Sequence, residues 1–202
     1  MNKLETLRSL ESKGLNVHNY VAFNPKDLNV IGGKREVLHI KPSGSYTVRF
    51  DRHSGFSADL PFVLLDGNQF DEVDFCLIRK KAEKLGCYLI LSDGRQYDKY
   101  LKYNIVCKVE HTGSFFYEFS PLQVPLRHMY RYPTSCLIGN LSDSKESWRI
   151  EKTASAQVNL PEVKRIVWDI YASQIHGRFI ECTLYNRPVG QLNTNMVFWH
   201  IA

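Results

Sequence analysis

The chain has 202 residues, of which 44% are hydrophobic and 23% charged, a balance typical of a globular protein and not of a disordered or fibrous one. This length suffices for one full hydrophobic core, so we expect a single domain, with two lobes of about residues 1–95 and 96–202 as the alternative organisation. The net charge of +5 is modest, and its cations are interleaved with acids, so the charge permits an anionic ligand without requiring nucleic acid.

Nothing in the sequence indicates a membrane protein or a secreted one. No stretch approaches the roughly 20 consecutive apolar residues that span a bilayer, and the N-terminal segment carries charges where a signal peptide is apolar. The five cysteines are an odd number without a CxxC pair, which predicts reduced, buried thiols. We therefore expect a cytoplasmic protein.

The first half of the chain contains helix and strand signals in alternation. Leucines at helical spacing before Gly14 predict an amphipathic helix over 3–13 with a glycine at its C-terminal end. The short apolar segment 19–23 predicts a strand that ends at an Asn-Pro turn. The segments 37–41 and 46–50, joined by Pro-Ser-Gly-Ser, are expected to form a hairpin.

The middle of the chain predicts the clearest helix and a second hairpin. Apolar positions with lysines and arginines between them predict a helix over 71–85, which Gly86 ends. A buried strand is expected over 87–91. The segments 104–110 and 114–119 flank His-Thr-Gly and are expected to pair as a hairpin.

The C-terminal part predicts one more helix and a closing pair of strands. Proline suits the first turn of a helix, so a helix is expected from Pro161 to about Ile175, followed by strands at 178–184 and 196–201. Hairpins separated by isolated helices favour an α+β fold of mainly antiparallel sheets with about three main helices.

Compact motifs for phosphate, dinucleotide, zinc or acyl chemistry are missing from the sequence. It contains no GxxxxGK[ST], GxGxxG, HExxH or GxSxG segment. Its seven histidines stand alone, with no His or Cys at ligand spacing. Any chemistry must therefore come from dispersed residues.

Two cations are candidates for binding phosphate. Lys3 stands at the start of the first helix, where a positive charge is unfavourable for the helix dipole unless an anion such as phosphate lies nearby. Arg49 stands near the end of a predicted strand, from which a guanidinium can clamp an oxyanion. The alternatives are a solvated terminal lysine and an ordinary cross-strand ion pair.

Two acids are candidates for a nucleotide and metal site. Glu118 and Glu181 both lie in apolar strands, where an acid is costly unless it is paired, binds a cation or lies on an exposed face. Exposure is the alternative for each. A magnesium nucleotide requires cations on its phosphates and one or two carboxylates or amides on the metal, and Asn193 or Asn195 would supply the amide.

The segment 3–17 resembles the opening of the ATP-grasp nucleotide-binding domain of phosphoenolpyruvate synthase and pyruvate phosphate dikinase. That opening has a lysine, leucines four and seven residues later, a glycine at eleven and a valine at fourteen. The matching residues here are Lys3, Leu7, Leu10, Gly14 and Val17. The family continues with a proline, where this chain has His18, and then with an apolar strand.

Two later segments extend this resemblance. The family has a strand YAVRSS whose arginine contacts phosphate; segment 46–51 is similar to it, with Arg49 in place and both serines missing. The segment 179–200 resembles the family's terminal hairpin, with Glu181 as its metal-binding acid and His200 where the family usually has Glu or Gln. The strand ending at Glu118 resembles another acidic strand of these domains.

The resemblance implies a shortened ATP-grasp domain that binds ATP and Mg²⁺. Lys3 and Arg49 would hold phosphates, and Glu181 with Asn193 or Asn195 would hold magnesium. As an enzyme, the chain would be an ATP-dependent phosphotransferase or ligase with an unknown acceptor.

In such an enzyme Lys3, Arg49 and Arg127 would stabilise charge on the transferring phosphoryl group, with Arg49 and Glu181 as its catalytic residues. The alternative is a degenerate binding module, an inhibitor or adaptor with a protein partner, which the missing serines and His200 favour. A third hypothesis, less favoured by the charge pattern, is nucleic-acid binding through a tyrosine and lysine segment: Tyr97, Lys99, Tyr100, Lys102 and Tyr103.

Overall fold

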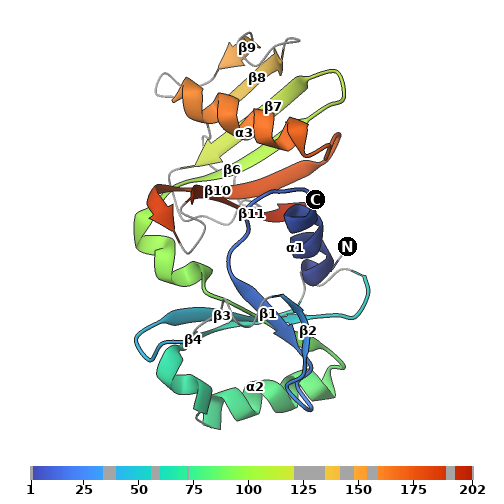
Figure 1. Cartoon of the computed structure of the whole chain (residues 1–202), viewed down its shortest axis with the longest axis vertical. Coiled ribbons are helices and arrows are strands. Elements are labelled where there is room, and N and C mark those ends of the chain that lie inside the picture. The colour runs from blue at the N-terminus through green and yellow to red at the C-terminus, as the bar shows by residue number, and fades with distance from the viewer. Residues whose placement is uncertain are drawn as a thin grey trace. The chain divides into compact units, whose positions relative to one another are not determined.

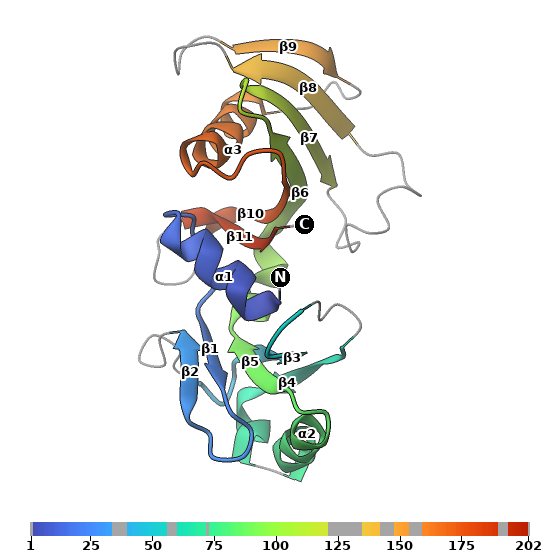
Figure 2. The same ribbon diagram turned by 90° about the vertical axis from the view of Figure 1, so that its right-hand side faces the viewer.

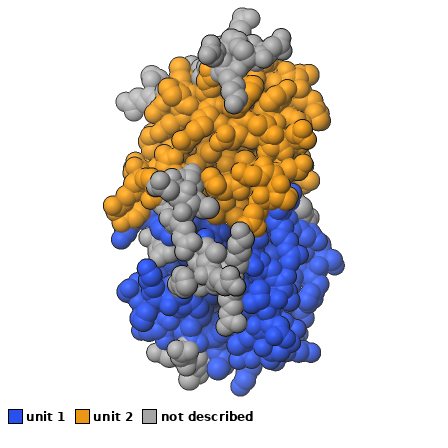
Figure 3. Space-filling view, in the orientation of Figure 1, with its two compact units in different colours: residues 1–9, 18–99 blue, residues 10–17, 100–202 orange. Residues whose placement is uncertain are grey.

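The chain folds into two compact units, each built on an antiparallel sheet. The computed structural model describes residues 2–33, 40–55, 60–71, 73–120, 135–141, 148–153, 159–189 and 194–201. Unit 1 consists of Met1–Ser9 with His18–Lys99, and unit 2 of Leu10–Val17 with Tyr100–Ala202 (Figure 3). Over the described residues, none of the helices has the length and apolar character required to cross a bilayer.

Helix α1 (Lys3–Ser12) begins at a capping box. The side-chain oxygen of Asn2 accepts from the N–H of Glu5 at 2.8 Å, and the Glu5 carboxylate accepts from the N–H of Asn2 at 3.0 Å. The helix ends just before Gly14, whose φ of +76° is the left-handed conformation that a glycine adopts at low cost.

Over the described residues, the sheet of unit 1 has five strands in the order β2-β1-β5-β3-β4, and every neighbouring pair is antiparallel. The strands are β1 (Tyr20–Phe23), β2 (Val30–Gly33), β3 (Ser45–Asp51), β4 (Phe62–Asp66) and β5 (Tyr88–Ser92). A 3-10 helix η2 (Gly67–Asp71) precedes α2 (Val73–Lys84), which lies against one face of this sheet (Figure 2).

Alternate residues of these strands build the core beneath α2. Val48 and Phe50 of β3 and Leu91 of β5 are buried and pack with Ile78 and Ala82 of α2. Side chains of a strand alternate between its two faces, so the intervening residues of β3 lie on the face opposite α2. That second face carries Arg49, which is half-buried.

In the part of unit 2 that the structure describes, the sheet has six antiparallel strands in the order β11-β10-β6-β7-β8-β9. They are β6 (Leu101–Val109), β7 (Ser114–Ser120), β8 (Ser135–Leu141), β9 (Trp148–Thr153), β10 (Phe179–Val189) and β11 (Thr194–Ile201). A 3-10 helix η3 (Gly94–Tyr100) precedes β6 in the chain.

Helix α3 (Leu160–Ala172) packs on β6 and β7 and covers one face of this sheet (Figure 1). Its first turn contains Pro161, and Asn159 caps it by accepting from the N–H of Glu162 at 3.4 Å. Its buried face consists of Val163, Ile166, Val167 and Ile170, which have helical spacing.

The predicted α+β class with mainly antiparallel sheets is confirmed, and the described residues contain three α-helices, in agreement with the prediction of about three. The predicted hairpin of 46–50 with 37–41 is wrong for the part that can be compared, because β3 pairs with β4 and β5, and residues 40 and 41 are in no strand. The thiol of Cys76 is exposed on α2, whereas the prediction was a buried one; Cys87, Cys107 and Cys182 are buried, as predicted.

Candidate functional site

The candidate site in unit 2 is a row of side chains across the sheet, on the face opposite α3. Directly opposite residues in an antiparallel pair place their side chains on the same face. Glu181 of β10 lies opposite His200 of β11 and Val106 of β6, and Val106 lies opposite Glu118 of β7. Because strands are about 4.8 Å apart, the backbone positions of Glu118 and Glu181 lie roughly 10 Å apart.

The alternation along β10 explains why Glu181 tolerates its apolar neighbours. Ile180 and Cys182 have no exposed surface and belong to the α3 side of the sheet, whereas Glu181 is half-buried on the other side. Glu118 is likewise half-buried between Tyr117 and Phe119, which are buried. The sequence-predicted acids therefore share one face of one sheet.

A β-bulge orients the side chains beside Glu181. Glu181 pairs with His200, but Cys182 pairs with Phe198, so Trp199 is the extra residue on β11. The indole N–H of Trp199 donates to Thr183 Oγ1 at 3.2 Å, and the Trp199 ring lies 6.2 Å from the His200 ring at an interplanar angle of 28°. Since the hydroxyl of Thr183 donates in turn to Asn104 at 3.0 Å, these contacts restrict the positions of both rings.

In this row Glu181 would offer one carboxylate to a magnesium ion. Magnesium prefers oxygen ligands and commonly keeps water and substrate phosphates beside one or two carboxylates. The residue opposite Glu181 is His200, which offers a nitrogen. Within the described ranges no three His, Cys, Asp or Glu residues form a cluster that could hold a metal by themselves.

In unit 1, the start of α1 is bound to the buried carboxylate of Asp51. The N–H groups of Lys3 and Leu4 donate to its two oxygens at 3.0 Å each, and the Tyr88 hydroxyl donates to it at 2.5 Å. This carboxylate supplies the negative charge that the helix N-terminus attracts. The bond from Lys3 to Asp51 involves the backbone N–H, and phosphate binding by the Lys3 ammonium stays a prediction.

Arg49 lies on the same face of the sheet of unit 1 as Asp51, two residues earlier on β3. It is opposite Ile90 and Phe62, and its guanidinium carbon lies 5.4 Å from the centre of the Phe62 ring, a cation–π contact. The structure therefore brings the two predicted phosphate-binding residues, Lys3 and Arg49, to one face of one unit.

His18 is a residue of this unit to which the sequence reasoning gave no role. Its ring stacks on Tyr97 at 5.9 Å, and a Cβ atom added to Gly94 would lie 2.8 Å from it, which explains the glycine there. Burial, and then the nearby ammonium of Lys3, lower the pKa of His18 to about 4. The imidazole is therefore neutral at pH 7, and the signal that could have marked it is its place where the similar family has proline.

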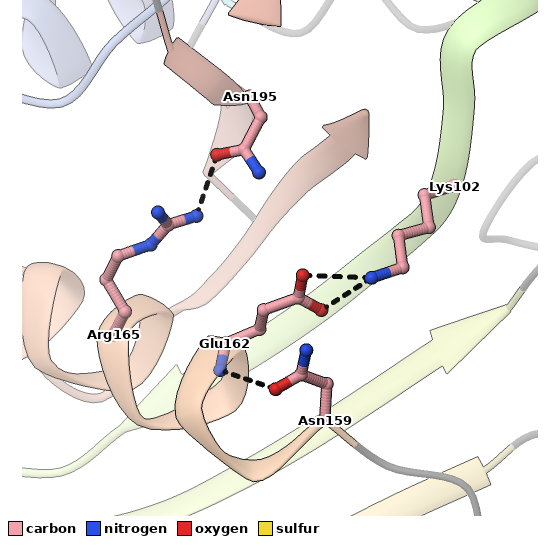
Figure 4. A network of polar contacts seen from close by, with 5 residues as sticks. All are labelled: Lys102, Asn159, Glu162, Arg165 and Asn195. Atoms are coloured by element: carbon pink, nitrogen blue, oxygen red, sulfur yellow. Dashed lines mark hydrogen bonds and ion pairs between the residues drawn. The ribbon is translucent and has the colours of Figure 1, made fainter. Parts of the chain in front are cut away.

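The remaining predicted ligands are placed elsewhere or lie outside the described residues. Asn195 does not join Glu181: its side-chain oxygen accepts from Arg165 of α3 at 2.9 Å (Figure 4). Arg127 and Asn193 lie outside the described residues.

Residues of the tyrosine and lysine segment proposed to bind nucleic acid contact other side chains of the protein. Tyr97 stacks on a histidine, and the guanidinium of Arg187 lies 3.4 Å from the centre of the Tyr100 ring. The ammonium of Lys102 pairs with Glu162 at 2.9 Å (Figure 4), and Tyr103 packs edge-on against an aromatic ring of β7. Four of the five residues thus contact other residues of the protein, and nucleic-acid binding by this segment stays a prediction.

Comparisons with solved structures find ligases. The ATP-grasp ligase PsnB complexed with minimal precursor is 10% identical over 97% of this chain and 50% of its own, with a TM-score of 0.43. The macrocyclase MdnC bound with precursor peptide MdnA from Microcystis aeruginosa MRC is 10% identical over 98% and 51%, with a TM-score of 0.45. An L-amino acid ligase from Bacillus licheniformis is 14% identical over 100% and 39%, with a TM-score of 0.41.

The chain thus spans about half the length of these structures or less. No family model matches the chain, and no curated protein matches it in sequence.

Proposed function

We propose that this chain is an ATP-grasp-like protein that binds a magnesium nucleotide, with Glu181 as the protein's ligand to the metal. The observation that carries the proposal is the row on the face opposite α3, in which Glu181 is half-buried between Val106 and His200. A half-buried carboxylate on a sheet face is a favourable ligand for a divalent cation. The resemblance of the segments 3–17 and 179–200 to phosphoenolpyruvate synthase and pyruvate phosphate dikinase supports it.

Lys3 and Arg49 are the proposed phosphate-binding residues of unit 1. A guanidinium binds phosphate through two parallel hydrogen bonds, and the packing of Arg49 on Phe62 limits the conformations of its side chain. The ammonium of Lys3 adds a second positive charge near the start of α1. Of the remaining assignments, Glu118 is proposed to contact the nucleotide and Arg127 the phosphates, while Asn193 stays a proposed metal ligand.

The reaction class that fits these residues is phosphoryl transfer or ligation, in the cytoplasm. Bound magnesium would supply charge neutralisation at the phosphates. The chain's own residues would bind and orient: Glu181 fixes the ion, and Arg49 stabilises negative charge on the group transferred. The acceptor is not specified by any of these contacts.

Thermal unfolding tests the nucleotide proposal. We expect millimolar ATP with Mg²⁺ to raise the melting temperature, because a ligand at a hundred times its Kd adds about 2.7 kcal/mol to the stability of the native state. ATP with EDTA should give a smaller shift. Equal shifts with Mg²⁺ and with EDTA, or no shift, would contradict the proposal.

Two matched pairs of variants assign the residues. Glu181→Gln should abolish the difference between Mg²⁺ and EDTA, whereas Glu118→Gln, on the same face of the same sheet, should keep it. Arg49→Gln should weaken the binding of ATP both with Mg²⁺ and with EDTA. Arg52→Gln, three residues later, is the control and should not weaken it.

A second candidate function is nucleotide binding without turnover. The observation that favours it is the position of His200 directly opposite Glu181, which leaves one carboxylate at the place of the proposed metal. This candidate predicts a magnesium-dependent rise in melting temperature and no formation of ADP or AMP over hours. Nucleotide turnover that Glu181→Gln abolishes would favour the enzyme instead.

A further inference from the structure

A pocket of about 390 Å³ opens on the α2 face of the sheet of unit 1, opposite the face that carries Arg49. Its size falls within the range of roughly 300–1,000 Å³ that small-molecule sites occupy. Its walls are apolar apart from two residues of α2, Cys76 and Arg79. The apolar lining consists of Val21, Phe23, Leu28, Val30, Ile40, Phe70, Phe75 and Leu91.

Apolar side chains remain open to water around this pocket. Leu28 is 38% exposed, Val30 41% and Ile40 43%. Exposed apolar surface that lines a concave site is a mark of ligand binding, because an apolar occupant removes that surface from water.

A guanidinium is fixed at the wall of the pocket. Arg79 is half-buried, and it donates from Nε to the carbonyl of Pro25 at 3.0 Å and from Nη2 to the carbonyl of Lys26 at 3.4 Å. Both acceptors are neutral, and in the part of the chain that the structure describes no carboxylate forms an ion pair with Arg79. Arginine has five N–H donors, and two of those of Arg79 are used by these carbonyls. The guanidinium therefore has further donors for an anion.

The loop that accepts from Arg79 is itself closed by hydrogen bonds. The N–H of Leu28 donates to the carbonyl of Asn24 at 2.8 Å, and the N–H of Asn24 donates to the carbonyl of Asn29 at 3.0 Å. Leu28 has a φ of 56°, a left-handed conformation that is costly for a leucine. The hydrogen bonds of this loop thus hold the carbonyls of Pro25 and Lys26 at Arg79. They also hold Leu28, in its costly backbone conformation, at the pocket.

We propose that this pocket binds a small apolar carboxylic acid. The carboxylate would accept hydrogen bonds from the free donors of Arg79, and the hydrocarbon body would lie between Leu28, Val30 and Phe75. One fixed cation beside apolar walls matches a monoanion with an apolar body better than it matches a nucleotide, which carries several charges. The proposal is independent of the nucleotide site, which involves other residues.

Octanoate and its neutral amide, octanamide, form a matched pair of probes for the full chain. We expect octanoate to shift the backbone amide resonances of Leu28, Val30 and Cys76 and the side-chain Nε–H of Arg79 in ¹H–¹⁵N spectra. Octanamide should bind at least about tenfold more weakly, since it lacks the charge. Equal binding of the two probes, or shifts confined to other residues, would overturn the proposal.

Variants test the role of the guanidinium. Arg79→Gln should lower the affinity for octanoate about tenfold and leave the affinity for octanamide nearly unchanged. Arg79→Lys should restore part of the preference for octanoate over octanamide. Arg165→Gln is the control, because Arg165 also makes a side-chain hydrogen bond but lies in unit 2. Unchanged octanoate affinity in Arg79→Gln would overturn the proposal, and the octanoate and octanamide comparison on the unaltered chain decides it even if that variant does not fold.

Discussion

The hydroxyl of Tyr88 donates a hydrogen bond of 2.5 Å to Asp51, whose carboxylate also accepts the N–H groups of Lys3 and Leu4. Asp51 is fully buried, so these donors replace the water that an ionised carboxylate would otherwise require. Burial, and then the hydrogen bond to Asp51, raise the pKa of Tyr88, which keeps its hydroxyl a donor. One carboxylate thereby joins the first turn of α1 to β3 and β5.

Removal of this carboxylate is expected to be strongly destabilising. Asp51→Ala leaves two backbone N–H groups and the Tyr88 hydroxyl without their acceptor, and we expect it to lower the free energy of unfolding by about 3–5 kcal/mol. Tyr88→Phe removes one of the donors and should cost about 1–2 kcal/mol. Urea unfolding at pH 7 measures both, and a smaller loss in Asp51→Ala than in Tyr88→Phe would show that the carboxylate is not the centre of this network.

His18 should make stability depend on pH. Its pKa in the folded protein is about 4, below the ordinary 6.5. Between pH 4 and 6.5, His18 is therefore protonated in the unfolded chain and neutral in the folded one. The contribution is present above pH 6.5 and is lost as the pH falls toward 4, by up to about 3 kcal/mol. His18→Gln should flatten the stability profile between pH 4 and 6.5 relative to the unaltered chain.

The pair His111 and His176 provides the comparison for that experiment. Their ring centres lie 4.2 Å apart, and burial, followed by His111, lowers the pKa of His176 while Glu110 raises it. His176→Gln should therefore flatten the profile in the same direction. A slope that neither histidine variant changes would contradict the assignment of this pH dependence to the histidines.

The elements that could be predicted from the sequence are those with a local signal. Gly14 and Gly86 have φ of +76° and +62° just after α1 and α2, and Pro161 lies in the first turn of α3, as the sequence predicted. The pairing of β3 was mispredicted. The Pro-Ser-Gly-Ser turn favours a hairpin with the preceding segment, whereas β3 pairs with β4. The partner of a strand is determined by packing over the whole sheet and not by the turn alone.

The candidate site was only partly predictable, for a related reason. The apolar neighbours of Glu118 and Glu181 indicated strands, but only the register shows that both acids lie in one row with His200. The role of Asp51 gave no signal, since its partners come from residues 37, 47 and 48 positions away in the chain. Asn195 has an amide at a plausible spacing for a metal ligand, but its side-chain oxygen accepts a hydrogen bond from Arg165.

The contact of Asn195 with Arg165 leads to a test of the metal ligands. Because its side-chain oxygen already accepts from a guanidinium, Asn195→Ala should leave the magnesium requirement of nucleotide binding unchanged. Its expected cost in stability is small, about 1 kcal/mol or less, since the hydrogen bond is exposed. Titration of Mg²⁺ at constant ATP, followed by melting temperature, compares it with Glu181→Gln, and a weaker response to Mg²⁺ in Asn195→Ala would place that amide at the metal after all.

His200→Glu tests whether the imidazole limits the proposed metal site. The substitution places a second carboxylate directly opposite Glu181, and like charges at opposed positions destabilise an antiparallel pair by about 0.2–1 kcal/mol. In EDTA we therefore expect a lower melting temperature than that of the unaltered chain. Magnesium should reverse the loss and raise the melting temperature by more than it does in the unaltered chain, because a pair of carboxylates binds a divalent cation more tightly than one does. His200→Gln, which removes the imidazole without adding charge, is the control, and an equal response of both variants to Mg²⁺ would show that this position does not face the metal.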